Sequence, residues 1–147
     1  MNPPPSSIGV SIRMRRQKSL DTAMEISLRR KLFSRGLRYR IHRQLVSGTR
    51  RQVDLAFMRA RVAVFLDGCF WHGCPQHGTI PRANREWWER KLRSNIERDK
   101  DTDRRLAQAG WLVVRVWEHE DLEDAAIRVE KAVRERARRT SRRGRRG

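Results

Sequence analysis

An apolar run that leads directly into a loop of cysteines, histidines and aromatics constrains this chain more than any other feature. Residues 62–66 have the length and the β-branched content of a buried strand. Asp67 follows at once, and the next residues, 69–77, contain both cysteines of the chain. Because functional side chains concentrate in loops that a rigid strand positions, we expect a chemical site at the end of this strand.

Three residues of the loop have the spacing of zinc ligands. Cys69, Cys74 and His77 form the pattern Cys-x4-Cys-x2-His, and tetrahedral Zn²⁺ favours thiolate and imidazole ligands. His119 is the best candidate for the fourth ligand, since it follows a second apolar run at 112–117. If the two runs pair in parallel, their ends meet and a structural zinc ion can join both loops. The alternative is two free cysteines among unrelated polar residues.

Positive charge dominates the composition. The 147 residues include 35 Lys and Arg against 17 Asp and Glu, a formal net charge of +18. This excess predicts a nucleic-acid partner, although a basic protein without chemistry would show the same balance. Two cysteines fit metal binding in a reducing cytosol, and no signal peptide or membrane-length apolar run occurs. We therefore expect a cytoplasmic, nucleoid-associated protein with no membrane partner.

The periodicity of the remaining sequence predicts an α/β fold. Helices are expected where apolar residues recur at helical spacing, and strands where short apolar or alternating runs occur. The expected helices are 20–35, 84–109 and 121–138, and the expected strands are 38–42, 52–58, 61–66 and 111–117. The order α-β-β-β-α-β-α implies a mixed central sheet flanked by helices.

The sequences at the two ends predict basic, disordered segments that flank one folded domain at 19–136. Residues 1–18 begin with prolines and serines and continue as a basic arm in which Met14 lies among arginines. Such an arm can neutralise phosphates while an apolar tip enters a groove, or it can be a solvated tail. Residues 137–147 are predicted to be a disordered basic tail that contacts phosphates.

The second and third strands predict a magnesium site. If they form a hairpin that turns at Arg59 and Ala60, paired residue numbers sum to about 119, and Asp54 lies opposite Phe65. Asp54 then lies at the same end of the hairpin as Leu66 and Asp67. A carboxylate beside a main-chain carbonyl and a second carboxylate suits Mg²⁺. The alternative is that Asp54 only ends a strand.

Two adjacent tryptophans near the start of the long helix have two possible roles. Trp87 and Trp88 are followed by arginines and lysines, and indole rings stack on nucleic-acid bases while guanidinium groups bind phosphate. The same tryptophans suit a hydrophobic core equally well. We expect at least one of them to be in the core.

Several motifs together resemble a known family. They are the Gly-Cys-Phe-Trp-His sequence at 68–72, Asp-Thr-Ala-Met-Glu at 21–25, Val-Asp at 53–54, Glu-Trp-Trp at 86–88, Asn-Ile-Glu-Arg-Asp at 95–99, Gly-Trp at 110–111 and Val-Trp-Glu at 116–118. The chain resembles the very-short-patch repair (Vsr) DNA mismatch endonucleases of the PD-(D/E)xK nuclease superfamily. The resemblance extends from about residue 14 to residue 119.

The resemblance implies a magnesium-dependent endonuclease that nicks one DNA strand 5′ of the thymine in a T·G mismatch. Such mismatches arise when 5-methylcytosine is deaminated. The expected partners are double-stranded DNA with a T·G mismatch and, functionally, a cytosine-5 DNA methyltransferase and repair proteins. The enzyme is expected to act as a monomer.

The resemblance also implies roles for individual residues. Asp54 would hold Mg²⁺ together with the main-chain oxygen of Leu66, His72 would be the general base, and Glu25 would position water or metal. The zinc ligands would be Cys69, Cys74, His77 and His119. The residues that contact DNA would be Met14, Arg15 and Arg16 of the arm and the wedge aromatics Phe70, Trp71 and Trp88.

Two departures from the superfamily pattern affect the site. The common pattern has a lysine two residues after its second acid, and counted from Asp67 that position is Cys69, so His72 must serve as base. Asp67 itself stands where some family members have a histidine, and it is a candidate second metal ligand or indirect base. Two other functions remain open: a restriction-type nuclease on paired DNA, and a noncatalytic, zinc-stabilised DNA-binding module.

Overall fold

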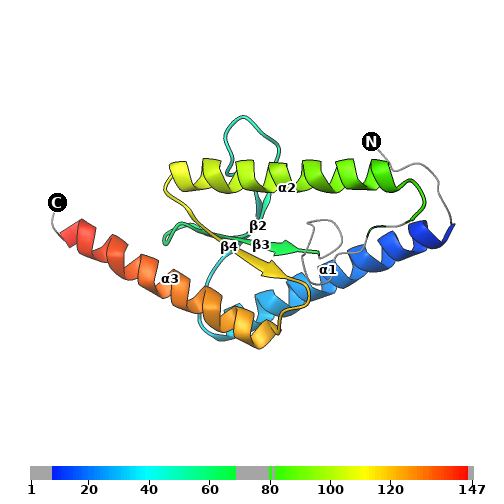
Figure 1. Cartoon of the computed structure of the whole chain (residues 1–147). Coiled ribbons are helices and arrows are strands. Elements are labelled where there is room, and N and C mark those ends of the chain that lie inside the picture. The colour runs from blue at the N-terminus through cyan, green and yellow to red at the C-terminus, as the bar shows by residue number, and fades with distance from the viewer. Residues whose placement is uncertain (1–7, 69–79, 81, 146–147) are drawn as a thin grey trace.

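The computed structural model describes residues 8–68, 80 and 82–145 of the chain (Figure 1). Its elements follow the order that the periodicity predicts. They are α1 (Ile8–Ser34), β1 (Arg40–Arg43), β2 (Val53–Phe57), β3 (Val62–Asp67), α2 (Arg85–Gln108), β4 (Leu112–Trp117) and α3 (Leu122–Arg145). The prediction of a mixed α/β fold is therefore confirmed, and the arrangement is consistent with a nuclease fold.

The sheet has the strand order β1-β2-β3-β4. β1 pairs with β2 and β2 with β3 in antiparallel fashion, whereas β3 and β4 are parallel. Leu55 pairs with Val64 and Phe57 with Val62, so paired residue numbers sum to 119 as predicted for the hairpin. Asp67 pairs with Trp117, which brings the carboxyl ends of β3 and β4 together.

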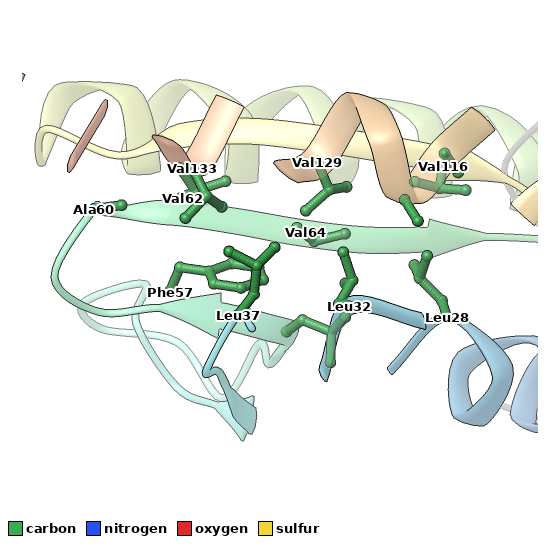
Figure 2. Packing of buried hydrophobic residues seen from close by; sticks show 13 residues of the cluster. Leu28, Leu32, Leu37, Phe57, Ala60, Val62, Val64, Val116, Val129 and Val133 are labelled. Atoms are coloured by element: carbon green, nitrogen blue, oxygen red, sulfur yellow. The ribbon is translucent and has the colours of Figure 1, made fainter. Parts of the chain in front are cut away.

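Helices cover both faces of the sheet. α1 and α3 lie on one face and α2 on the other (Figure 1). Figure 2 shows Leu32 of α1 and Val129 of α3 directed towards Val64 of β3, and all three are fully buried in one cluster. On the α2 face, Ala63 and Phe65 of β3 pack with Leu106. β3 is apolar on both faces because both are covered, as expected for a central strand.

The two basic ends differ from the prediction. α1 begins at Ile8 rather than near residue 20, and α3 continues to Arg145 rather than ending near residue 138. Both additions are rich in arginine and lack proline, and arginine is among the better helix formers. These helix bounds extend beyond the domain predicted at 19–136, and the disorder predicted at the two ends stays a prediction. Among the helices that the structure describes, none is both long and apolar enough to cross a membrane.

Candidate active site

Asp54 lies on β2 at the end of the hairpin that the predicted register indicates. Its Oδ2 accepts a hydrogen bond of 2.8 Å from the main-chain N–H of Leu66. The antiparallel register places Asp54 opposite Phe65, so the hydrogen bond joins Asp54 to Leu66, the next residue along β3. The sequence therefore predicted correctly that Asp54 meets the Leu66 main chain. The Leu66 carbonyl as a metal ligand stays a prediction.

Glu25 and His42 lie beside Asp54. Glu25 comes from α1 and His42 from β1, and their Oε2 and Nε2 atoms are 3.5 Å apart. Within the described part of the chain, potential ligand atoms of Glu25, His42 and Asp54 all lie within 4.8 Å of one another. Carboxylate and imidazole groups in this arrangement can hold a divalent cation. The cluster joins two residues that the sequence singled out with one that it did not.

His42 was missed because its role depends on the pairing of β1. Ile41 pairs with Leu55 and Arg43 with Val53, so the register brings His42 beside Asp54. His42 also has a positive φ of 51°, an uncommon conformation for a residue other than glycine. The sequence signal that could have found it was a histidine at the end of a short strand next to the strand that carries Asp54.

The environment of Asp54 changes its acidity. Burial, helped by the negative charge of Glu25, raises the pKa of Asp54 to about 6, while the hydrogen bond from Leu66 N–H has the opposite effect. A buried carboxylate near a second carboxylate favours the protonated form because two negative charges are costly without a counter-ion. A bound cation would supply that counter-ion.

Asp67 is bound by an arginine. It is 2% exposed, and its two carboxylate oxygens accept hydrogen bonds of 2.9 and 3.0 Å from Arg115 Nη1. Arg115 also donates a hydrogen bond to Asp103 and lies over the ring of Phe65 at 4.4 Å. The structure therefore gives Asp67 a guanidinium partner where the sequence suggested a metal ion or a proton.

The charges around Arg115 balance one another. Burial, the largest influence, lowers the pKa of Arg115, but the hydrogen bond to Asp103 and the charges of Asp67, Asp103 and Asp99 outweigh it and raise the pKa above the ordinary value. Arg115 therefore stays charged and neutralises Asp67 permanently. This pairing explains how a carboxylate can be buried at the end of β3.

A pocket of about 330 Å³ opens beside Asp54, between the sheet and α2. Asp54, Leu66 and Asp67 line it from the sheet, and Arg98 lines it from α2. Arg98 is exposed, so its guanidinium can meet an anion that enters the pocket. The pocket thus joins Asp54, one member of the candidate cation site, with a positive group suited to phosphate.

Two of the predicted zinc ligands closely follow β3 and β4 in the sequence. His119 comes two residues after Trp117, and Cys69 comes two residues after Asp67, the partner of Trp117 in the sheet. His119 is exposed and its ring stacks on Trp117 at 6.4 Å. Cys69, Cys74 and His77 lie outside the described residues, as does the predicted base His72. The parallel pairing that the zinc hypothesis needs is confirmed, and the ion stays a prediction.

The predicted DNA-contacting residues fall into two groups. Met14, Arg15 and Arg16 lie within α1, where the side chain of Arg15 is exposed. Trp88 is fully buried and packs edge-to-face on Trp87 at 4.9 Å, so in this structure it is a core residue and has no surface to offer a base. The expectation that one of the two tryptophans is core is confirmed. Phe70 and Trp71 lie outside the described residues.

Comparison with known proteins identifies the family. Residues 9–77 match the family described as DNA mismatch endonuclease Vsr. The chain is 45% identical over 129 residues to the type II nicking enzyme V.NaeI of Lentzea aerocolonigenes, and the matched region covers 86% of this chain and 78% of the relative. The chain belongs to the Vsr family of DNA endonucleases.

Two other Vsr relatives extend the comparison. The type II nicking enzyme V.NmeDIP of Neisseria meningitidis serogroup C is 36% identical over 84% of each chain. The DNA mismatch endonuclease Vsr of Escherichia coli is 33% identical over 78% of this chain and 75% of the relative. The family assignment makes DNA the partner that the net charge of +18 predicts.

Proposed function

We propose that this Vsr endonuclease is magnesium-dependent and nicks one DNA strand 5′ of the thymine in T·G mismatches that 5-methylcytosine deamination produces. The observation that carries the proposal is the convergence of Asp54 and Glu25 beside the Leu66 main chain at one end of the β2–β3 hairpin. In a chain with a net charge of +18, a carboxylate cluster that would repel phosphate has a purpose in catalysis and none in binding alone. The E. coli relative, named a DNA mismatch endonuclease, supports the choice of substrate.

The residues present fit the proposed metal. Asp54 and the main-chain oxygen of Leu66 would hold Mg²⁺, and Glu25 would hold it or a water molecule next to it. When bound, Mg²⁺ supplies a Lewis acid that stabilises charge on the phosphate and lowers the pKa of a water molecule. The raised pKa of Asp54 agrees with a buried carboxylate whose charged form a bound cation would stabilise.

The other proposed roles belong to residues that bind and orient DNA or move a proton. Arg98, which lines the pocket beside Asp54, would bind a phosphate next to the bond that is cleaved. His72 would accept the proton of the attacking water, since an imidazole titrates near neutral pH. Phe70 and Trp71 would open the mismatched step, which costs less than opening a paired one, while Met14 would enter the minor groove.

Structural zinc would join the loops after β3 and β4. The proposed ligands Cys69, Cys74, His77 and His119 suit Zn²⁺ by type and by spacing. The enzyme would act as a monomer on double-stranded DNA, and it would function together with a cytosine-5 DNA methyltransferase and repair proteins in the bacterial cytoplasm.

The test is nicking of a T·G duplex in the presence of Mg²⁺ by the wild-type enzyme and by Asp54→Ala. We expect the variant to lose nicking and to keep duplex binding, since Asp54 holds the metal and not the DNA. Asp124→Ala, which removes an exposed carboxylate from α3, is the matched control and should nick normally. Normal nicking by Asp54→Ala would contradict the metal role.

The choice of DNA distinguishes the proposed function from restriction-type nicking of paired DNA. Several relatives are named type II nicking enzymes, so the matched duplex of the same sequence must be assayed beside the T·G duplex. We expect nicking of the T·G duplex only. Equal nicking of both duplexes would favour the restriction-type function, and no nicking of any mismatched duplex would favour a binding module.

A further inference from the structure

The histidine beside Asp54 has no place in the proposed magnesium site. We propose that the imidazole Nε2 of His42 is a direct ligand of the divalent ion, and that this nitrogen makes the site prefer Mn²⁺ over Mg²⁺. The inference rests on the proposed function in one respect, namely that Asp54 holds a divalent ion. It adds a ligand and a metal preference that the proposed function does not contain.

The geometry of the three side chains suits one ion. Bonds of about 2.1 Å in an octahedral site place adjacent ligand atoms about 3 Å apart and opposite ones about 4 Å apart. The Nε2 of His42 and the Oε2 of Glu25 are 3.5 Å apart, and the whole set with Asp54 lies within 4.8 Å. Small side-chain rotations would bring all three to bonding distance. The remaining positions would be left for water and phosphate.

The elements that carry the three ligands are tied to one another. Asp54 is fixed by its bond from Leu66 N–H, and His42 is placed beside it by the pairs on either side in β1 and β2. Glu25 projects from α1, whose next turns, at Leu28 and Leu32, are fully buried against the sheet. A cluster from three separately anchored elements is preorganised, so little side-chain ordering is needed for binding.

The donor types decide the preference for the metal. Mg²⁺ selects oxygen ligands and keeps several waters, whereas imidazole suits transition metals. Mn²⁺ accepts carboxylate oxygen and also binds an N/O set, so two carboxylates and one imidazole fit it better than they fit Mg²⁺. His42 has 46% of its side-chain surface exposed, which leaves the ring accessible to an entering ion.

The competing explanation is that His42 only forms an ion pair with Glu25. An ion pair with one partner this exposed contributes little to stability, about 0–1 kcal/mol. In that case, replacement of His42 would leave the bound metal unchanged. The two explanations therefore differ in whether a nitrogen nucleus is bonded to the ion, and this can be measured without any assay of nicking.

The experiment is electron spin-echo spectroscopy of Mn²⁺ bound to the zinc-loaded protein, both free and bound to uncleaved matched duplex. We expect modulation from a directly bonded ¹⁴N nucleus in the wild type and its replacement by a ¹⁵N signal after labelling of histidine. His42→Gln should lose the nitrogen signal, and its affinity for Mn²⁺ should fall by at least about tenfold. Replacing a residue that only hydrogen-bonds to a metal ligand already lowers metal affinity by about that factor, so the loss of a direct ligand should lower it at least as much. Its affinity for Mg²⁺ should change much less.

Two control variants separate this histidine from others. Arg43→Gln changes the exposed neighbour of His42 on β1 and should keep the nitrogen signal. His72→Ala should also keep it, which would exclude the proposed base as its source. Thermal melting of each variant checks that the fold is retained.

Two results would overturn the inference, and they have different meanings. Tight Mn²⁺ binding that Asp54→Ala abolishes, but without a histidine nitrogen signal, would remove His42 from the site and leave the proposed function intact. Absence of Mn²⁺ and Mg²⁺ binding by the wild type, with and without duplex, would remove both the His42 ligand and the metal-dependent function.

Discussion

The pairing of Asp67 with Arg115 allows a quantitative prediction about stability. Arg115→Met keeps an unbranched side chain at this position, but Asp67 loses the guanidinium that binds both of its oxygens, and Phe65 loses the same group from over its ring. Asp67 is 2% exposed, so water cannot replace the missing partner without structural change. Removal of one partner of a buried ion pair costs about 3–5 kcal/mol.

Protonation of Asp67 limits this cost. At pH 7, protonating an ordinary aspartic acid with a pKa of about 3.9 costs about 4 kcal/mol, and each unit of lower pH reduces that cost by about 1.4 kcal/mol. The folded variant would hold a proton that the unfolded chain releases near pH 4, so its stability falls as the pH rises. We expect a loss of about 3–4 kcal/mol at pH 7 and about 1.5 kcal/mol at pH 5.

Urea denaturation followed by tryptophan fluorescence at several pH values measures these free energies. Arg128→Met is the matched control, because Arg128 pairs with Glu120 at 3.0 Å but has 49% of its side chain exposed, and its replacement should cost less than about 1 kcal/mol. The double variant Asp67→Asn with Arg115→Met should recover most of the stability. A loss that does not change with pH, or a double variant as unstable as the single one, would show that packing and not charge is responsible.

Three further predictions test other parts of the molecule. Without added divalent ions, Asp54→Asn should stabilise the protein above pH 6 by up to about 3 kcal/mol, since burial raises the pKa of Asp54 to about 6, and thermal melts should show no gain below pH 4. Elemental analysis should find about one zinc ion per chain, and Cys69→Ser should lower both zinc content and melting temperature. Arg138 and Arg142 line a groove of about 520 Å³ on α3. The double variant Arg138→Ala with Arg142→Ala should bind DNA with a weaker salt dependence. The slope of log K against log salt concentration should become less negative by about 0.9 for each phosphate that the variant no longer neutralises.

The sequence alone determined the order of the elements, the hairpin register and the contact of Asp54 with the Leu66 main chain. These follow from local information: apolar periodicity marks strands and helices, and a short turn leaves one main way to pair the strands beside it. The parallel pairing of the runs before Cys69 and His119 was also predictable, because a helix connects them.

Only the tertiary structure decided which polar side chains meet. His42 joins Glu25 and Asp54 because β1 pairs with β2 while α1 packs on the same sheet, and no local pattern encodes either distance. In the same way, Arg115 binds Asp67 through the β3–β4 pairing. Apolar periodicity predicts which face of a helix or strand is buried. The partner of a polar side chain depends instead on how distant segments pack together.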